Sequence, residues 1–220
     1  MYKDADPEAI ERGALRCFRN SGQSCNAPTR MLVEKSLYSE AIERLKKFAN
    51  EFKVDDPNKE GDHIGPVISE NQFNKIQSLI KKGIDEGANL VAGGPGKPEG
   101  LKDGYYVKPT VFADVNNSME IARTEIFGPV LSVIPFETEE EAIKIANDTE
   151  YGLAGYVQGE PGHAKEVARK IRAGQVIING GARGTGAPFG GYKASGNGRE
   201  HGLHGIEECL ETKAIIVPAS

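Results

Sequence analysis

The sequence predicts an α/β fold, a three-layer α/β/α arrangement around a largely parallel sheet. Three observations support this prediction. Amphipathic helical segments alternate along the chain with short apolar segments that favour strands. Two of those segments, 129–136 and 175–179, are rich enough in Val, Ile and Leu to form buried strands. The 220 residues are enough to bury one core with a small extension.

Strands are predicted where β-branched and apolar residues cluster between turn signals. The predicted strands are 30–38, 89–93, 105–115, 129–136, 153–159, 175–179 and 211–217. Pro109 argues for an edge or a break within its strand, because proline cannot donate to a ladder. The glycine-rich segment 93–104 is predicted to be a hairpin-like excursion.

Helices are predicted where apolar residues recur every three or four positions behind an N-cap. The predicted helices are 11–18, 39–52, 69–87, 138–148 and 161–174. Ser39 is the expected cap of the second helix. Capping boxes, in which a side chain at each end satisfies a free backbone N–H, open the third and fourth helices. Their members are Ser69 with Gln72 and Thr138 with Glu141.

Charge and cysteine content exclude several classes of protein. A formal net charge of −5 offers no basic field for nucleic acid. No apolar run approaches the length of a membrane span and no signal-peptide pattern opens the chain, so a cytoplasmic protein is expected. Three cysteines without CxxC spacing favour neither disulfides nor zinc. His201 and His204 have HxxH spacing but no carboxylate between them, so no metal site is predicted.

The glycine-rich stretches contain no recognisable phosphate cradle. A dinucleotide fingerprint requires GxGxxG between a strand and a helix, and a P-loop requires GxxxxGK followed by Ser or Thr. GGPGK fails the second pattern, while GTGAPF and GNGREH lack the last glycine of the first. By composition alone these are loops. The long glycine-rich segment 180–202 is either functional or disordered, because such loops are rare in compact domains.

Cys25 differs from the other two cysteines in its surroundings. Cys17 lies in a helical run beside apolar residues and is expected in the core, and Cys209 lies among acidic residues that disfavour a thiolate. Cys25 is flanked by Gly22, Ser24 and Asn26, which permit a tight turn with free N–H groups. A thiolate there could attack a carbonyl. A reactive thiol, an inert loop thiol and a Cys–His hydrolase dyad all remain open.

Three motifs in order resemble the aldehyde dehydrogenase superfamily. The first is FRNSGQSCNAPTR (18–30), which matches the pattern around the catalytic cysteine. The second is TEIFGPV (124–130), in which the family's Glu holds the nicotinamide ribose and its Phe lies against the nicotinamide. The third is PFGGYKASGNGRE (188–200), the loop that closes the aldehyde tunnel. The resemblance covers essentially the whole chain and implies the family's catalytic-domain fold.

The resemblance implies roles for individual residues. Cys25 would be the catalytic nucleophile and Glu200 a carboxylate that relays protons, although Glu200 could instead pair with Arg199. Glu125 and Phe127 would bind the NAD or NADP cofactor, and Gln72 and Lys75 would approach its ribose. Asn20 and Phe189 would belong to the substrate pocket. The residues so implied are Cys25, Glu200, Glu125, Phe127, Gln72, Lys75, Phe189 and Asn20.

Length is the main departure from the family. Family members are roughly twice as long, and their first half supplies the dinucleotide-binding domain, a glutamate general base and an asparagine of the oxyanion hole. The resemblance therefore implies the C-terminal catalytic portion, with residues 1–206 as the catalytic domain and 207–220 as an oligomerisation strand segment. A homo-oligomer, or pairing with a cofactor-binding half, is expected.

The implied reaction is oxidation of an aldehyde to a carboxylic acid. The Cys25 thiolate adds to the aldehyde, hydride passes to NAD(P), and the thioacyl-enzyme is hydrolysed. Because the general base and cofactor domain are expected elsewhere, turnover by this chain alone should be absent or very weak. Two alternatives remain: a non-catalytic remnant or interaction module that assembles with a full-length dehydrogenase, and an NAD-independent cysteine esterase.

Overall fold

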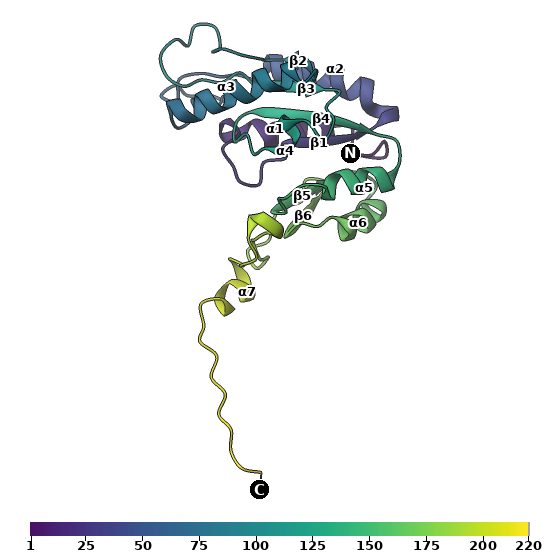
Figure 1. Ribbon diagram of the computed structural model, residues 1–220, viewed down its shortest axis with the longest axis vertical. Coiled ribbons are helices and arrows are strands. Elements are labelled where there is room, and N and C mark those ends of the chain that lie inside the picture. Colours follow the sequence, from purple (N-terminus) through teal and green to yellow (C-terminus); the bar gives the residue numbers. More distant parts are fainter. Residues whose placement is uncertain (220) are drawn as a thin grey trace.

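The computed structural model of the chain describes residues 1–219 (Figure 1). Its α-helices are α1 (Ala9–Phe18), α2 (Lys35–Glu51), α3 (Glu70–Asp85), α4 (Glu120–Arg123), α5 (Glu139–Asn147), α6 (Pro161–Lys170) and α7 (Gly202–Glu207). Its strands are β1 (Arg30–Glu34), β2 (Asn89–Ala92), β3 (Thr110–Ala113), β4 (Val130–Phe136), β5 (Ala154–Val157) and β6 (Gln175–Ile178). Short 3₁₀ turns occupy Arg19–Gly22 and Lys193–Ser195.

The main sheet has the strand order β1-β4-β3-β2. β1 and β3 each run parallel to β4, and only the edge strand β2 is antiparallel, to β3. The glycine-rich segment 93–104 lies between β2 and β3, as the hairpin-like excursion requires. The predicted largely parallel sheet is therefore confirmed.

Helices cover both faces of this sheet, which gives the predicted three layers. Alternate residues of β4 serve the two faces, because successive strand side chains point to opposite sides. Leu131 and Val133 pack with α1 and α2, whereas Val130 and Ile134 pack with α3. All four side chains are buried.

β5 and β6 form a separate parallel pair rather than extending the main sheet. A third apolar cluster joins this pair to α5, α6 and the N-terminal residues. Its buried members are Tyr2, Phe136, Ala142, Val157, Ala164 and Val167. In Figure 1 the pair lies beside α5 and α6, below the main sheet.

Several predicted element boundaries were wrong, among them the end of the helix expected over 161–174, which stops at Lys170. The strand expected over 30–38 ends at Glu34, and α2 begins at Lys35, so Ser39 lies inside the helix and does not cap it. The reason is that Leu37, Ala41 and Leu45 lie four residues apart on one helical face, which packs on the core. The strand expected over 105–115 shrinks to β3, which begins directly after Pro109.

The C-terminal segment extends away from the folded body (Figure 1). Residues 211–217 form no strand, because no neighbouring strand is available to them in this chain. Ile215, Ile216 and Val217 are largely exposed. No helix within residues 1–219 is both long and apolar enough to cross a bilayer.

Candidate active site

Cys25 lies just beyond a sharply turned segment that follows α1. Asn20, Ser21 and Gly22 all adopt left-handed backbone conformations, with φ of 53°, 56° and 71°. A Cβ atom on Gly22 would lie 2.1 Å from the backbone carbon of Gly128. Glycine is therefore required at position 22 both by the turn and by the close approach of two backbones. This contact brings the cysteine loop against the 124–130 segment.

Side-chain hydrogen bonds hold the turn in place. The Asn20 amide donates to the Gln23 carbonyl at 2.8 Å, and the Gln23 side chain accepts from the Ile68 N–H at 2.8 Å. The Ser21 hydroxyl donates to the Gly65 carbonyl at 2.8 Å. Asn20, expected in the substrate pocket, is exposed and does not line either cavity beside Cys25. Its side-chain hydrogen bond to the Gln23 carbonyl instead holds the turn before Cys25.

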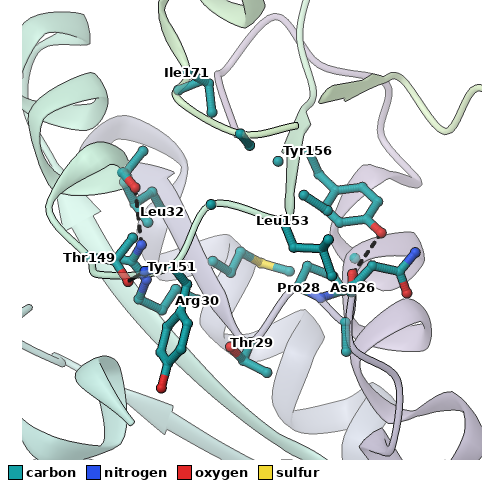
Figure 2. Close-up of a pocket in the computed structure, with 18 of the residues that line it drawn as sticks. Asn26, Pro28, Thr29, Arg30, Leu32, Thr149, Tyr151, Leu153, Tyr156 and Ile171 are labelled. Atoms are coloured by element: carbon teal, nitrogen blue, oxygen red, sulfur yellow. Dashed lines mark hydrogen bonds between the residues drawn. The ribbon is translucent and has the colours of Figure 1, made fainter. Parts of the chain in front are cut away.

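Tyr156 supports the chain on the other side of Cys25. Its hydroxyl donates to the Asn26 carbonyl at 2.8 Å, as Figure 2 shows. The Arg16 guanidinium lies 5.2 Å from the centre of the Tyr156 ring. Burial of the phenol raises the pKa of Tyr156, so it stays a neutral hydrogen-bond donor over the physiological range. β5 and α1 together therefore fix the residue next to the thiol.

Cys25 lines two cavities at once. One cavity, of about 480 Å³, also includes Glu125 and Phe127 in its wall. The other, of about 400 Å³, is lined by residues of β6 and of the glycine-rich segment. The residues of this second cavity are Cys25, Asn26, Gln175, Ile177, Arg183, Phe189, Glu200 and His201. The exposed thiol thus lies at the border between two compartments.

The first cavity is lined by two of the four residues implied to bind cofactor, Glu125 and Phe127. Glu125 is exposed and Phe127 is half-buried with φ of 56°. The Gln72 side-chain amide donates to the carbonyls of Ile126 and Phe127, both at 2.9 Å, and the Lys75 ammonium donates to the Glu125 carbonyl at 2.8 Å. Gln72 and Lys75 therefore hold this segment by its backbone and do not line the cavity.

The second cavity is built from the segment 188–201 folded back on itself. Phe189 and Glu200 form an antiparallel bridge, with N–H to carbonyl distances of 2.8 and 2.7 Å. The Arg183 guanidinium lies 5.2 Å from the Phe189 ring centre, and the His201 ring meets Phe189 edge-on. Arg199 binds backbone carbonyls and covers Tyr192, so the alternative pairing with Glu200 is not formed.

Of the other two cysteines, Cys17 lies in the core as predicted. Cys17 is fully buried, and burial raises the pKa of its thiol to about 12. Cys209 is exposed next to α7, away from both cavities. Within residues 1–219 no group of His, Cys, Asp or Glu side chains is arranged to hold a metal ion.

Several cavity residues carried no recognisable signal in the sequence. Arg183, Gln175 and Ile177 lie in the second cavity, and Tyr156 and Arg16 support the Cys25 loop, yet none belongs to a motif. His201 was considered only as a metal ligand. Arg183 and Phe189 form a cation–π contact, but their spacing in the sequence does not predict it, because only the folded loop brings the two side chains together.

The first cavity fits part of a nicotinamide cofactor. An exposed carboxylate and a half-buried aromatic ring share it with the thiol, and these suit ribose hydroxyls and a flat ring respectively. No glycine-rich phosphate cradle occurs between a strand and a helix in residues 1–219.

Comparison with known proteins agrees with the resemblance carried by the three motifs. The aldehyde dehydrogenase family model matches residues 1–215. A putative aldehyde dehydrogenase of Staphylococcus saprophyticus is 52% identical over 217 residues, 98% of this chain and 46% of the relative. The 3-succinoylsemialdehyde-pyridine dehydrogenase of a Pseudomonas species is 50% identical over 218 residues, again 98% and 46%. The chain thus spans about half the length of these relatives.

Solved structures agree. A mutant aldehyde dehydrogenase C of Pseudomonas syringae, complexed with NAD+ and octanal, is 50% identical with a TM-score of 0.96, over 99% of this chain and 46% of that one. An aldehyde dehydrogenase of Bartonella henselae is 54% identical with a TM-score of 0.94, over 96% and 45%. Sequence, fold and cavity lining lead to one conclusion: the chain belongs to the aldehyde dehydrogenase family.

Proposed function

We propose that this chain supplies the nucleophile and the substrate-side wall of an aldehyde dehydrogenase site. The observation that carries the proposal is the position of Cys25 on two cavities, one bearing Glu125 and Phe127 and the other Phe189 and Glu200. A thiol between an aldehyde compartment and a cofactor compartment can present the same carbon to both.

The proposed chemistry begins with addition of the Cys25 thiolate to the aldehyde carbon. The bond formed is C–S, and the carbonyl oxygen becomes an oxyanion. The backbone N–H of Cys25 donates no hydrogen bond within residues 1–219, so it is free to stabilise that oxyanion. Phe189 would bound the aldehyde side, and Glu200, at the rim of the same cavity, would accept or return a proton.

The cofactor side is proposed from Glu125 and Phe127. NAD, when bound, supplies an acceptor for the hydride of the oxidation. The Glu125 carboxylate would hold ribose hydroxyls and the Phe127 ring would lie against the nicotinamide. Gln72 and Lys75 are proposed to act as positioning residues for these two, because their nitrogens already donate to the carbonyls of 125–127.

Assembly and location are proposed on separate grounds. The apolar residues exposed at the C-terminal end fit a segment buried in an oligomer or against a cofactor-binding half. They are Leu203, Ile206, Leu210, Ile215, Ile216 and Val217. A cytoplasmic location stays a prediction, in line with three cysteines that are all free thiols.

The test separates the thiol from the complete reaction. The purified chain is mixed with an acyl ester that releases a chromophore, and with aldehyde plus NAD. We expect the native chain to release one equivalent of chromophore as its thiol is acylated, and Cys25→Ala to release none. The matched control Cys209→Ser should release the same amount as the native chain. NADH formation should be negligible throughout.

Two outcomes would contradict the proposal. Acylation that persists in Cys25→Ala would place the nucleophile elsewhere. Steady NADH production dependent on Cys25 would show that this chain binds cofactor and turns over alone. Continuous ester turnover without NAD would instead support the esterase alternative.

A further inference from the structure

Arg183 brings a guanidinium into the cavity on the substrate side of Cys25. The thiol, Phe189 and Glu200 line the same cavity, whose volume is about 400 Å³. A guanidinium stays charged throughout the pH range in which proteins are folded. Within residues 1–219, Arg183 makes no ion pair and its side chain donates no hydrogen bond. A cation without a partner therefore lies in the compartment proposed to receive the aldehyde.

The neighbouring arginine of the glycine-rich segment is in a different state. The Arg199 guanidinium donates to the carbonyls of Gly191, Asn197 and Gly198, each at 2.9 Å, and it does not line the cavity. Its donors hold the fold of the segment. Arg183 keeps all of its N–H donors available to a ligand.

Backbone contacts hold the segment that carries Arg183. Turns at 178–181 and 184–187 flank this residue, each closed by a hydrogen bond from its last N–H to its first carbonyl, at 2.9 and 3.0 Å. Farther along, a Cβ atom on Gly202 would lie 2.2 Å from the Gly186 carbonyl oxygen, so the two backbones are in close contact. These contacts keep the end of β6, Arg183 and the start of α7 together.

Phe189 positions the guanidinium inside the cavity. The Arg183 guanidinium carbon lies 5.2 Å from the centre of the Phe189 ring. A guanidinium that lies on an aromatic ring interacts through its face, and the N–H groups at its edge stay free for an acceptor. Glu200 is a carboxylate on the same cavity, but it forms no ion pair with Arg183 in the described residues 1–219. The charge of Arg183 is therefore not neutralised by a neighbour.

We propose that Arg183 is a specificity-determining residue that binds the carboxylate of an aldehyde whose other end is anionic, a semialdehyde of a dicarboxylic acid. The planar guanidinium matches a carboxylate with two parallel N–H bonds. An aldehyde with an uncharged tail gains nothing from this residue. The inference rests on the proposed function and deepens it, because it names the substrate class of the same site.

The binding step needs no cofactor and can be measured on this chain. Addition of the Cys25 thiol to the aldehyde carbon forms a C–S bond, and the thiol proton moves to the former carbonyl oxygen. The addition is reversible and blocks alkylation of the thiol. Alkylation of Cys25 by iodoacetamide, followed by peptide mass spectrometry, therefore reports how much aldehyde is bound. Cys209→Ser chains serve as the background, because Cys209 is exposed as well.

The probes are two matched pairs of aldehydes. Succinic semialdehyde is compared with butanal, and adipic semialdehyde with hexanal, so that each acid has a neutral partner with the same number of carbons. For each pair, the preference is the ratio of the concentrations that halve the alkylation rate. The two lengths allow for either span between the thiol and the guanidinium.

The variants separate Arg183 from the general charge of the surface. We expect Arg183→Gln to reduce the preference for the acid by at least ~3-fold in one pair or both, the effect of a solvent-exposed ion pair. Arg183→Lys should retain part of the preference, because it keeps the charge but loses the planar fork. Arg19→Gln is the matched control and should change nothing, since Arg19 is exposed and lines neither cavity. Protection by the neutral aldehydes should be the same in every variant.

Two results would overturn the inference. One is the same preference in the native and Arg183→Gln chains, and the other is an equal loss in Arg19→Gln. The proposed function would survive both results, provided that the neutral aldehydes still protect Cys25. A native chain in which no aldehyde slows alkylation would contradict the proposed function and this inference together.

Discussion

At the residue scale, the loop that carries Cys25 is held by neighbours that are distant in sequence. Asn26, directly after the thiol, is held through its carbonyl by Tyr156, and Arg16 packs over that ring. Replacing one hydroxyl should therefore loosen the loop without removing any reacting group. The loop is a case in which a positioning residue can be tested independently of the nucleophile.

Tyr156→Phe removes the hydroxyl and leaves the Asn26 carbonyl without its donor. We expect a loss of about 1 kcal/mol in the free energy of unfolding, measured by urea titration. The rate of Cys25 alkylation should also change, because the loop that carries the thiol loses this hydrogen bond. Tyr105→Phe, on an exposed tyrosine, is the matched control and should alter neither quantity. Equal effects in both variants would show that Tyr156 has no special role.

The candidate site was partly predictable at this scale. Cys25, Glu125, Phe127, Phe189 and Glu200 lie in recognisable motifs, and the structure places all of them on the two cavities. The remaining lining residues could not be predicted, because their position depends on how β6 and segment 180–202 fold in space. Gln72 illustrates a further limit: its backbone N–H is capped by Ser69 as predicted, but its side chain holds the carbonyls of Ile126 and Phe127 instead of completing the box.

At the element scale, the contact between the cysteine loop and the 124–130 segment leaves no room for a side chain at position 22. Gly22→Ala places a Cβ 2.1 Å from Gly128 and requires a left-handed alanine. We expect a loss of roughly 2–4 kcal/mol in unfolding free energy from strain and overpacking together. Gly186→Ala is the control, since a Cβ there meets nothing within 4 Å. A Gly22→Ala variant as stable as the control would mean that the loop relaxes freely.

His163 ties α6 to α5 and to the N-terminal segment. Its two ring nitrogens lie 2.9 Å from the Asp4 and Glu139 carboxylates, which accept hydrogen bonds from the ring and so raise the pKa of His163 above the usual 6.5. A raised pKa in the folded state contributes stability that is complete below 6.5 and is lost as pH rises through the folded value.

Variants at His163 should therefore show a defect that depends on pH. We expect His163→Gln to lower the melting temperature more at pH 6 than at pH 9, in thermal denaturation scans at both values. His204→Gln, on the exposed α7, serves as control and should show little change. A defect of the same size at both pH values would indicate lost packing against Tyr2, whose ring lies 4.5 Å away, rather than lost charge pairing.

Local sequence signals predicted which helices and strands form better than they predicted the residues at which these begin and end. The caps Ser69 and Thr138 are confirmed, each accepting from the N–H three residues later. Ser39 failed because the apolar spacing of Leu37, Ala41 and Leu45 extends the helix past it. A cap competes with the burial of a helical face, and here burial contributes more.

At the scale of the whole molecule, the division into two sheets was not predictable, because strand order depends on contacts between distant segments. The helix–strand alternation predicts layers and parallel pairing but does not say which strands are neighbours. The C-terminal segment shows the same limit. Its β-branched residues favour a strand, yet 211–217 stays unpaired in one chain because strands need a partner.

The Met1 ammonium produces a pH dependence that involves the whole fold. Burial lowers its pKa to about 5 from the ordinary 8.0. The unfolded chain therefore binds a proton more tightly, and stability should rise as pH increases from about 5 to 8. The full penalty at low pH is on the order of 4 kcal/mol. Nα-acetylation removes the charge, so it should raise the melting temperature at pH 5.5 and much less at pH 8.5.

The control for this measurement is the unmodified chain, whose Met1 ammonium still titrates. The acetylated chain should lose the rise in stability between pH 5 and 8, and the unmodified chain should keep it. If stability still rises with pH after acetylation, other titratable groups must cause the rise, and His163 is the first to examine.

The backbone contact between Gly22 and Gly128 has a consequence for how this family can diverge. Two segments more than a hundred residues apart in the chain are in backbone contact, so position 22 cannot gain a side chain unless the 124–130 segment moves. A side chain at position 128 would instead meet Ile76 of α3, 2.6 Å from its Cβ. Natural variation should therefore treat the thiol loop and the Glu125–Phe127 segment as one inherited unit, exchanged or lost together in recombination between relatives. Laboratory chimeras that take the two segments from different parents should fold best when both parents keep glycine at these positions.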